Sequence, residues 1–112
     1  MEVRFHHAAR TEFNALPTDE QDAMRTAIAR LEEFGDQLGA PHTSAVRGSA
    51  GLRELRPRRG RSPWRAIYRR VGEIMIVGAF GPEVQVDRPG FDRAVRLAEG
   101  RIAEVERRRL ES

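Results

Sequence analysis

Residues 52–80 read LRELRPRRGRSPWRAIYRRVGEIMIVGAF, and the rest of the chain is organised around this stretch. Its last part, residues 74–80, is short, apolar and rich in β-branched side chains, which is typical of a strand covered on both faces. Residues 52–56 and 64–70 interleave arginine with apolar residues. Because successive side chains of a strand point to opposite faces, each run can bury one face and present guanidinium groups on the other. The stretch therefore predicts a three-stranded antiparallel meander with a basic surface.

Helical patterns precede the meander. Residues 2–5 are expected to form an edge strand, and a helix is expected from residue 6 or 7 to 16. Pro17 interrupts this helix, and a 3.6-residue apolar period predicts a second helix over residues 19–34. Thr18 and Gln21 have the spacing of a capping box at its start. The two helices form a hairpin with one apolar face, and the glycine-rich residues 35–51 are expected to form a connecting loop.

A closing helix follows the meander. Pro89 and the helix cap expected at Asp87 mark its start, and the chain's strongest helical period predicts a helix over residues 89–108. The expected fold class is α+β, in the order strand, helix, helix, three strands, helix. A length of 112 residues suits a single domain, expected to span residues 1–112.

Composition excludes several function classes. The chain has no cysteine, so disulfides and thiolate metal sites are excluded. It has no apolar run near the roughly 18 residues that a membrane span needs, and its first residues lack a signal-peptide core. A cytoplasmic protein without a metal, a cofactor or a membrane partner is expected.

Positive charge is concentrated in the meander. Residues 1–46 hold four arginines and eight acids, and residues 72–112 hold seven arginines and eight acids. Residues 47–71 hold nine arginines and one acid, a net charge of +8 in a chain of net charge +3. Every basic residue other than histidine is arginine, so each of these charges is a planar fork that stays charged at neutral pH. A focused basic surface of this kind indicates a phosphate-rich partner.

Three motifs in this order resemble the RelE/ParE toxin superfamily, and within it the HigB-like toxins of phage-derived type. They are Leu-x-Glu-Leu-Arg at 52–56, aromatic-Arg-x-x-Tyr at 64–68 and an apolar strand ending at Phe80. The glycine- and proline-containing residues 38–42 also resemble this branch. The resemblance covers nearly the whole chain and implies a RelE-like fold.

The resemblance also implies a function. RelE-like toxins of type II toxin–antitoxin systems cleave messenger RNA on the ribosome, by attack of the 2′-hydroxyl on the adjacent phosphorus without a metal. Expected partners are therefore the ribosome, mRNA and a cognate antitoxin, which in the HigB branch usually has a helix-turn-helix. An arginine fork matches phosphate oxygens and can stabilise the charge that develops on the phosphorane.

The motifs select the site residues. Arg56 and Arg65 match family positions and are the first catalytic candidates. Arg88 is the third, because it is the only basic residue between Phe80 and Pro89, where this branch carries lysines. Five other arginines of the meander are expected to bind RNA phosphates: Arg53, Arg58, Arg59, Arg61 and Arg69.

Alternative roles accompany these assignments. Arg56 or Arg65 could pair with Glu54 or with an acid on the last helix and hold the sheet together. His42 has a suitable unperturbed pKa for proton transfer but lies in a loop, and Tyr68 and Trp64 are expected in the core. Two other functions remain compatible with the fold: a ParE-like inhibitor of DNA gyrase and a non-catalytic nucleic-acid-binding module.

Overall fold

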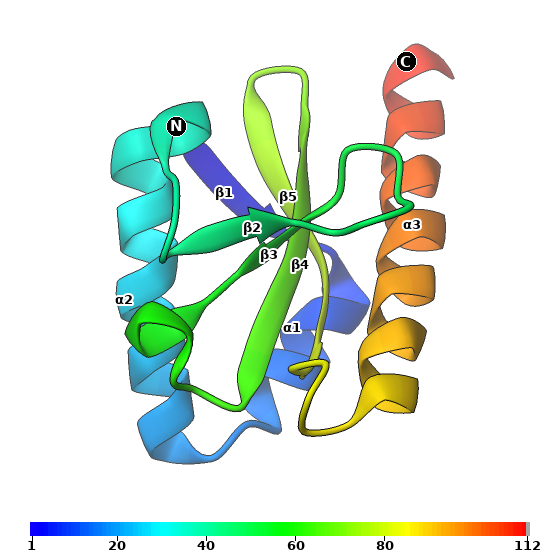
Figure 1. Cartoon of the computed structure of the whole chain (residues 1–112). Coiled ribbons are helices and arrows are strands. Elements are labelled where there is room, and N and C mark those ends of the chain that lie inside the picture. The colour runs from blue at the N-terminus through cyan, green and yellow to red at the C-terminus, as the bar shows by residue number, and fades with distance from the viewer. Residues whose placement is uncertain (112) are drawn as a thin grey trace.

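The structure is a computed structural model and describes residues 1–111 (Figure 1). Within these residues, five strands form one sheet in the order β1-β5-β4-β3-β2. β1 is parallel to β5, and the other neighbouring strands are antiparallel. The elements are β1 (Glu2–Phe5), α1 (His7–Asn14), α2 (Thr18–Phe34), η1 (Gly35–Gln37), β2 (Thr43–Ala45), β3 (Arg53–Leu55), η2 (Pro57–Gly60), β4 (Trp64–Val71), β5 (Ile74–Pro82) and α3 (Arg88–Glu111).

The order of elements confirms the α+β fold with an N-terminal strand, a helical hairpin, an antiparallel meander and a C-terminal helix. β1 is an edge strand, as expected, and β5 lies inside the sheet between β1 and β4. The sheet gains one unexpected strand, β2, which pairs with β3. β2 has three residues, too few to show a period within a glycine-rich segment.

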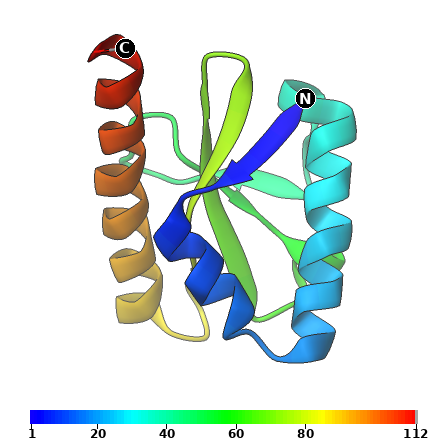
Figure 2. The ribbon, with the colours of Figure 1, turned by 180° about the vertical axis from the view of Figure 1, so that it is seen from behind.

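Helices cover both faces of the sheet. α1 and α2 pack on one face around Phe13, Met24, Leu31 and Tyr68. α3 packs on the other face, and its apolar stripe meets buried residues of β4 and β5, with this core made of Val46, Leu52, Ile67, Val71, Ile76, Ala79, Phe91, Ala94, Ala98 and Ile102. Seen from behind, α1 lies in front of the sheet between α2 and α3 (Figure 2). The expectation of an open arginine face on the meander was therefore wrong, since α3 covers much of that face.

Two glycines of β5 allow α3 to lie close to the sheet. A Cβ at Gly78 would lie 2.8 Å from Ala98 Cα, and one at Gly81 would lie 2.6 Å from Ala94 Cβ. A side chain at either position would push the helix away. The close contact fixes the start of α3 beside the end of β5, where the candidate residues gather.

The two predicted helix starts differ in outcome. Asp87 caps α3, because its Oδ1 accepts a hydrogen bond from the Gly90 amide at 3.0 Å. The capping box at α2 is absent: Pro17 occupies the cap position, and the Gln21 side chain donates to the carbonyl oxygens of Asn14 and Leu16. No helix within residues 1–111 has the length and apolarity needed to cross a membrane.

Candidate nucleic-acid interface

The η2 loop between β3 and β4 is held in an unusual backbone conformation. Arg58 and Arg59 have φ values of 54° and 58°, and Gly60 has 91°. Left-handed backbone costs roughly 1–2 kcal/mol for each residue that carries a side chain. Contacts from elsewhere in the fold must therefore hold the loop in place.

Glu20 of α2 supplies the main contacts to this loop. Glu20 is 8% exposed, and its carboxylate accepts hydrogen bonds from the Ser62 hydroxyl at 2.6 Å and from the Arg58 guanidinium. Burial raises the pKa of Glu20, but these two hydrogen bonds together lower it by a larger amount. The pKa of Glu20 therefore lies below its usual value. A buried carboxylate thus ties the strained loop to α2.

A depression of about 270 Å³, the arginine hollow, lies between the η2 loop and the segment after β5. Arg56 lies at its edge with its side chain one third exposed. The Arg56 Nε is buried and has no hydrogen-bond partner within residues 1–111; its distance to Glu54 Oε1 is 3.9 Å. The residues that line the hollow are Arg56, Gly60, Arg61, Ser62, Pro63, Arg65, Glu83, Gln85 and Val86.

Arg65 forms the floor of the hollow and is 2% exposed. Its Nε donates to Glu54 at 3.2 Å, and its two terminal nitrogens donate to the carbonyl oxygens of Ser62 at 2.7 Å and Gly60 at 3.2 Å. Glu83 lies 3.6 Å from Nη2. Burial lowers the pKa of Arg65, and the Glu54 and Glu83 carboxylates oppose this shift. Arg65 therefore braces the η2 loop against β3 and the end of β5.

Arg88 lines a neighbouring depression of about 370 Å³. Its side chain is 72% exposed and lies 4.0 Å from Asp92. Glu54 joins the two depressions, because it binds Arg65 in the hollow and also lines the depression beside Arg88. The three catalytic candidates thus lie on one side of the molecule, with Arg56 and Arg65 together and Arg88 next to them.

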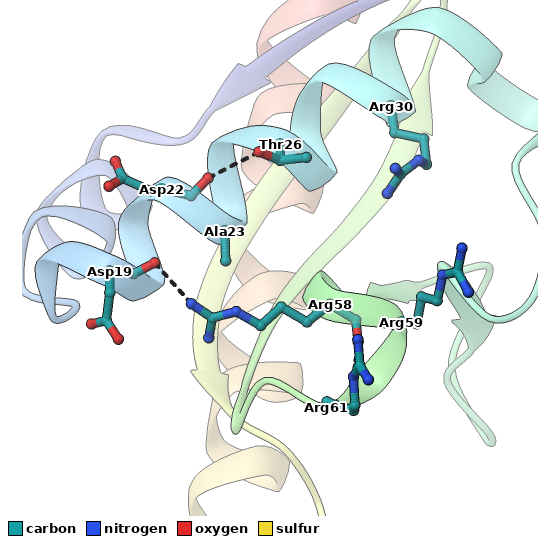
Figure 3. Close-up of a pocket in the computed structure, with 8 residues that line it drawn as sticks. All are labelled: Asp19, Asp22, Ala23, Thr26, Arg30, Arg58, Arg59 and Arg61. Carbon is teal, nitrogen blue, oxygen red and sulfur yellow. Dashed lines mark hydrogen bonds between the residues drawn. The ribbon is translucent and has the colours of Figure 1, made fainter.

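The loop arginines line a separate groove between α2 and η2, of about 540 Å³ (Figure 3). Arg58 is bound to Glu20, whereas Arg59 and Arg61 are exposed. This surface is called the basic groove; its lining residues are Asp19, Asp22, Ala23, Thr26, Arg30, Arg58, Arg59 and Arg61.

Arg53 and Arg69 lie away from these depressions. Arg69 donates to both carboxylate oxygens of Glu106 on α3, at 3.1 and 2.6 Å. The hydrogen bond from Arg69 lowers the pKa of Glu106, and burial opposes that shift. Arg53 lies beside Asp36 and Tyr68. RNA binding by these two arginines stays a prediction, and the ion pair gives Arg69 a structural role.

The remaining candidates have structural contacts. Tyr68 is 2% exposed, and its hydroxyl lies 2.7 Å from the Thr43 hydroxyl, while Trp64 packs against the same core, as expected for both. The His42 Nδ1 lies 3.4 Å from a guanidinium nitrogen of Arg30. No group of three or more His, Cys, Asp or Glu within residues 1–111 is arranged to hold a metal ion.

Sequence reasoning missed the roles of Glu20 and Arg30. Glu20 had a signal, because it lies on the same helical stripe as the buried Met24, Ala27 and Leu31. A carboxylate on an apolar stripe needs a buried partner. Arg30 had no such signal, since its contact with His42 depends on the path of the chain after α2.

The chain is an α+β domain with helices on both faces of the sheet and an arginine-lined hollow. Comparison with known proteins identifies the family that has this fold. Residues 11–79 match the family described as Phage derived protein Gp49-like (DUF891), and the chain belongs to this family. This confirms the resemblance to the phage-derived branch. A search of curated proteins gave no significant match.

Solved structures of an E. coli toxin share the fold. A double-arginine mutant of E. coli RelE in the free state matches with a TM-score of 0.61 and 16% identity, over 85% of this chain and 94% of that one. Isolated E. coli RelE matches with a TM-score of 0.59 and 18% identity, over 82% and 96%. The intact E. coli RelBE toxin–antitoxin complex matches with a TM-score of 0.58 and 17% identity, over 73% and 95%. These matches confirm the RelE-like fold.

Proposed function

We propose that this protein is the toxin of a type II toxin–antitoxin system and cleaves mRNA on the ribosome. Family membership and the RelE-like fold support the toxin assignment. The observation that carries the nuclease assignment is Arg56, whose buried Nε lacks a hydrogen-bond partner within the described chain and whose side chain borders the arginine hollow. Buried polar groups of native proteins are nearly always hydrogen-bonded. This Nε is closed to solvent and lies 3.9 Å from Glu54, so a phosphate in the hollow meets the exposed third of the Arg56 side chain.

The hollow also supplies groups for the chemistry. Arg56 and Arg61 stabilise the charge that develops on the phosphorane, and Arg65 adds positive charge from the floor. Glu83 is the proposed base for the 2′-hydroxyl proton, because it lines the hollow and its contact with Arg65, at 3.6 Å, is longer than a hydrogen bond. The oxygen–phosphorus bond to the 2′-oxygen forms, the bond to the 5′-oxygen breaks, and the departing 5′-oxygen takes a proton from water.

The experiment is primer extension on cellular mRNA after induction of the protein. Wild type is compared with Arg56→Ala and with Arg96→Ala, which removes an exposed arginine of α3 and serves as the charge-matched control. We expect breaks at ribosomal A-site codons for wild type and Arg96→Ala, and a strong loss for Arg56→Ala. Intact mRNA with a DNA-damage response would instead identify a gyrase inhibitor. Intact mRNA without a DNA-damage response would indicate a non-catalytic nucleic-acid-binding module.

Loop and strand arginines are ranked by the same experiment. Arg58→Ala and Arg59→Ala should reduce cleavage less than Arg56→Ala, because screened loop charges contribute shared affinity that weakens with salt. Equal losses of mRNA cleavage at all three positions would indicate that the arginine surface is a binding patch, and would contradict the nuclease assignment.

The proposed partner is an antitoxin of helix-turn-helix type. Residues 47–71 carry nine arginines and one acid, so an acidic segment or domain is the complementary surface. The RelBE toxin–antitoxin complex contains the same fold and supports this pairing. Co-expression with the product of the adjacent gene should give a tight complex that weakens with salt. Separate elution of the two proteins at low salt would contradict the pairing.

A further inference from the structure

The basic groove holds cations that no carboxylate neutralises. Arg30 extends from α2, and Arg59 and Arg61 extend from the opposite side of the groove (Figure 3). Within residues 1–111 none of these three arginines forms an ion pair, whereas the neighbouring Arg58 is bound to Glu20. Three guanidinium groups that line one groove repel one another unless an anion lies between them. Their arrangement therefore indicates an anion-binding groove.

His42 lies beside the positive charges of the basic groove. Its ring lies 3.4 Å from Arg30. Partial burial lowers the pKa of His42, and the nearby charges of Arg30 and Arg59 lower it further. A bound anion would offset these two charges and raise the pKa of His42.

The groove has a polarity along its length. Asp19 and Asp22 lie at one end, and Asp22 is paired with Arg25 at 3.0 Å outside the groove. The Asp19 carboxylate is directed away from the groove in Figure 3. An anion is therefore drawn toward the end formed by Arg30 and Arg59. The wall contributed by α2 includes the small Ala23 and Thr26, which leave room for a polymer backbone.

The groove and the arginine hollow share one lining residue. Arg61 lines both depressions. The Arg56 amide also donates to the His42 carbonyl oxygen at 2.9 Å, so the backbone beside the groove is fixed to the backbone beside the hollow. An extended strand with repeating phosphates suits two depressions that share Arg61, because one phosphate can lie in the hollow and a neighbouring one in the groove.

We propose that the basic groove is a second phosphate subsite, in which Arg30 and Arg59 hold the RNA strand next to the phosphate that is cleaved. The inference rests on the proposed function and adds Arg30 and His42 to the RNA contact surface. Arg61 lies between the two subsites. The groove contributes affinity and strand direction, and the reacting phosphate stays in the hollow.

The test uses a short RNA with 2′-methoxy groups, which binds but cannot be cleaved by 2′-hydroxyl attack. Fluorescence anisotropy measures its affinity for wild type, Arg30→Gln, Arg30→Lys and the control Arg96→Gln over a range of salt concentrations. We expect Arg30→Gln to weaken binding about tenfold and to reduce the salt slope by about one. Arg30→Lys should recover part of the affinity, and Arg96→Gln should bind like wild type. NMR titration of the His42 ring should show a higher pKa in the presence of the RNA.

Each outcome decides the proposal. An Arg30→Gln variant with wild-type affinity and salt slope, or a His42 pKa unchanged by RNA, overturns the second subsite. A short polyglutamate peptide that raises the His42 pKa when RNA does not would show that the groove takes an acidic peptide, and it also overturns the proposal. Because this RNA is not cleaved, groove binding with the predicted Arg30 dependence supports the subsite even if wild type cleaves no mRNA. Groove binding without mRNA cleavage would refute only the nuclease assignment and would leave the second subsite supported.

Discussion

Replacing Arg65 with alanine should strongly destabilise the fold. The change removes a guanidinium that is 2% exposed. It leaves the Glu83 carboxylate without the cation that pairs with it, and it leaves Glu54 with the more distant Arg56 Nε at 3.9 Å; both carboxylates are less than one fifth exposed. It also leaves the carbonyl oxygens of Ser62 and Gly60 without a donor. Removing one partner of a buried ion pair costs about 3–5 kcal/mol. Since a domain has about 5–15 kcal/mol of stability in total, the variant should fold but with a much reduced margin.

The assay is urea denaturation followed by far-UV circular dichroism and by the fluorescence of Trp64, which is packed against the core. Arg69→Ala is the matched control, because it removes an arginine from the same strand, whose Glu106 partner is 40% exposed. That pair should contribute only about 1 kcal/mol or less. If Arg65→Ala lost no more unfolding free energy than Arg69→Ala, Arg65 would not brace the hollow.

Three further predictions concern the surroundings of the hollow. The folded-state pKa of Glu20 lies below its ordinary value of 4.5, so the contribution of this carboxylate to stability is complete above that pH and is lost as the pH falls through the lowered pKa. Between pH 6 and 3, the urea midpoint of Glu20→Gln should therefore fall less steeply than that of wild type. Parallel curves would argue against the link between Glu20 and the η2 loop. Gly60→Ala places a Cβ 2.7 Å from Arg56 Nη2 at a φ of 91°, so primer extension should show loss of mRNA cleavage comparable to that of Arg56→Ala, and normal cleavage would mean that Arg56 tolerates displacement. Arg88→Ala should keep the wild-type unfolding midpoint, because its side chain is 72% exposed, while mRNA cleavage falls; unchanged cleavage would exclude Arg88 from the site.

Strands and helices with a strong apolar pattern could be predicted from the sequence. β5 lies between β1 and β4 with helices on both faces, so almost every residue in it is buried and the apolar run is unbroken. α3 shows a clear period because one stripe packs on the sheet. β2 could not be predicted, since three residues in a glycine-rich segment carry no periodic signal and pair only through the tertiary path of the chain.

The candidate site could be predicted in part. Strand alternation places Arg65 and Arg69 on the same face, but it does not show that α3 covers this face and supplies Glu106 to Arg69. Nor does it distinguish the fully bonded Arg65 from Arg56, whose Nε has no bonding partner in the described part of the chain. That difference depends on the positive-φ backbone of the η2 loop. Two consecutive arginines in a sequence do not predict such a backbone.

The decisive measurement for the arginine hollow is single-turnover cleavage of end-labelled mRNA on programmed ribosomes by purified protein. Wild type should cut the mRNA in the ribosomal A site. Arg56→Ala should cut at the same position but about 10²–10³ times more slowly, because one preorganised donor to the phosphorane is lost, while its unfolding midpoint stays close to that of wild type. Equal cleavage rates for the two proteins, or intact mRNA with wild type, would contradict the assignment of the arginine hollow as a ribonuclease site.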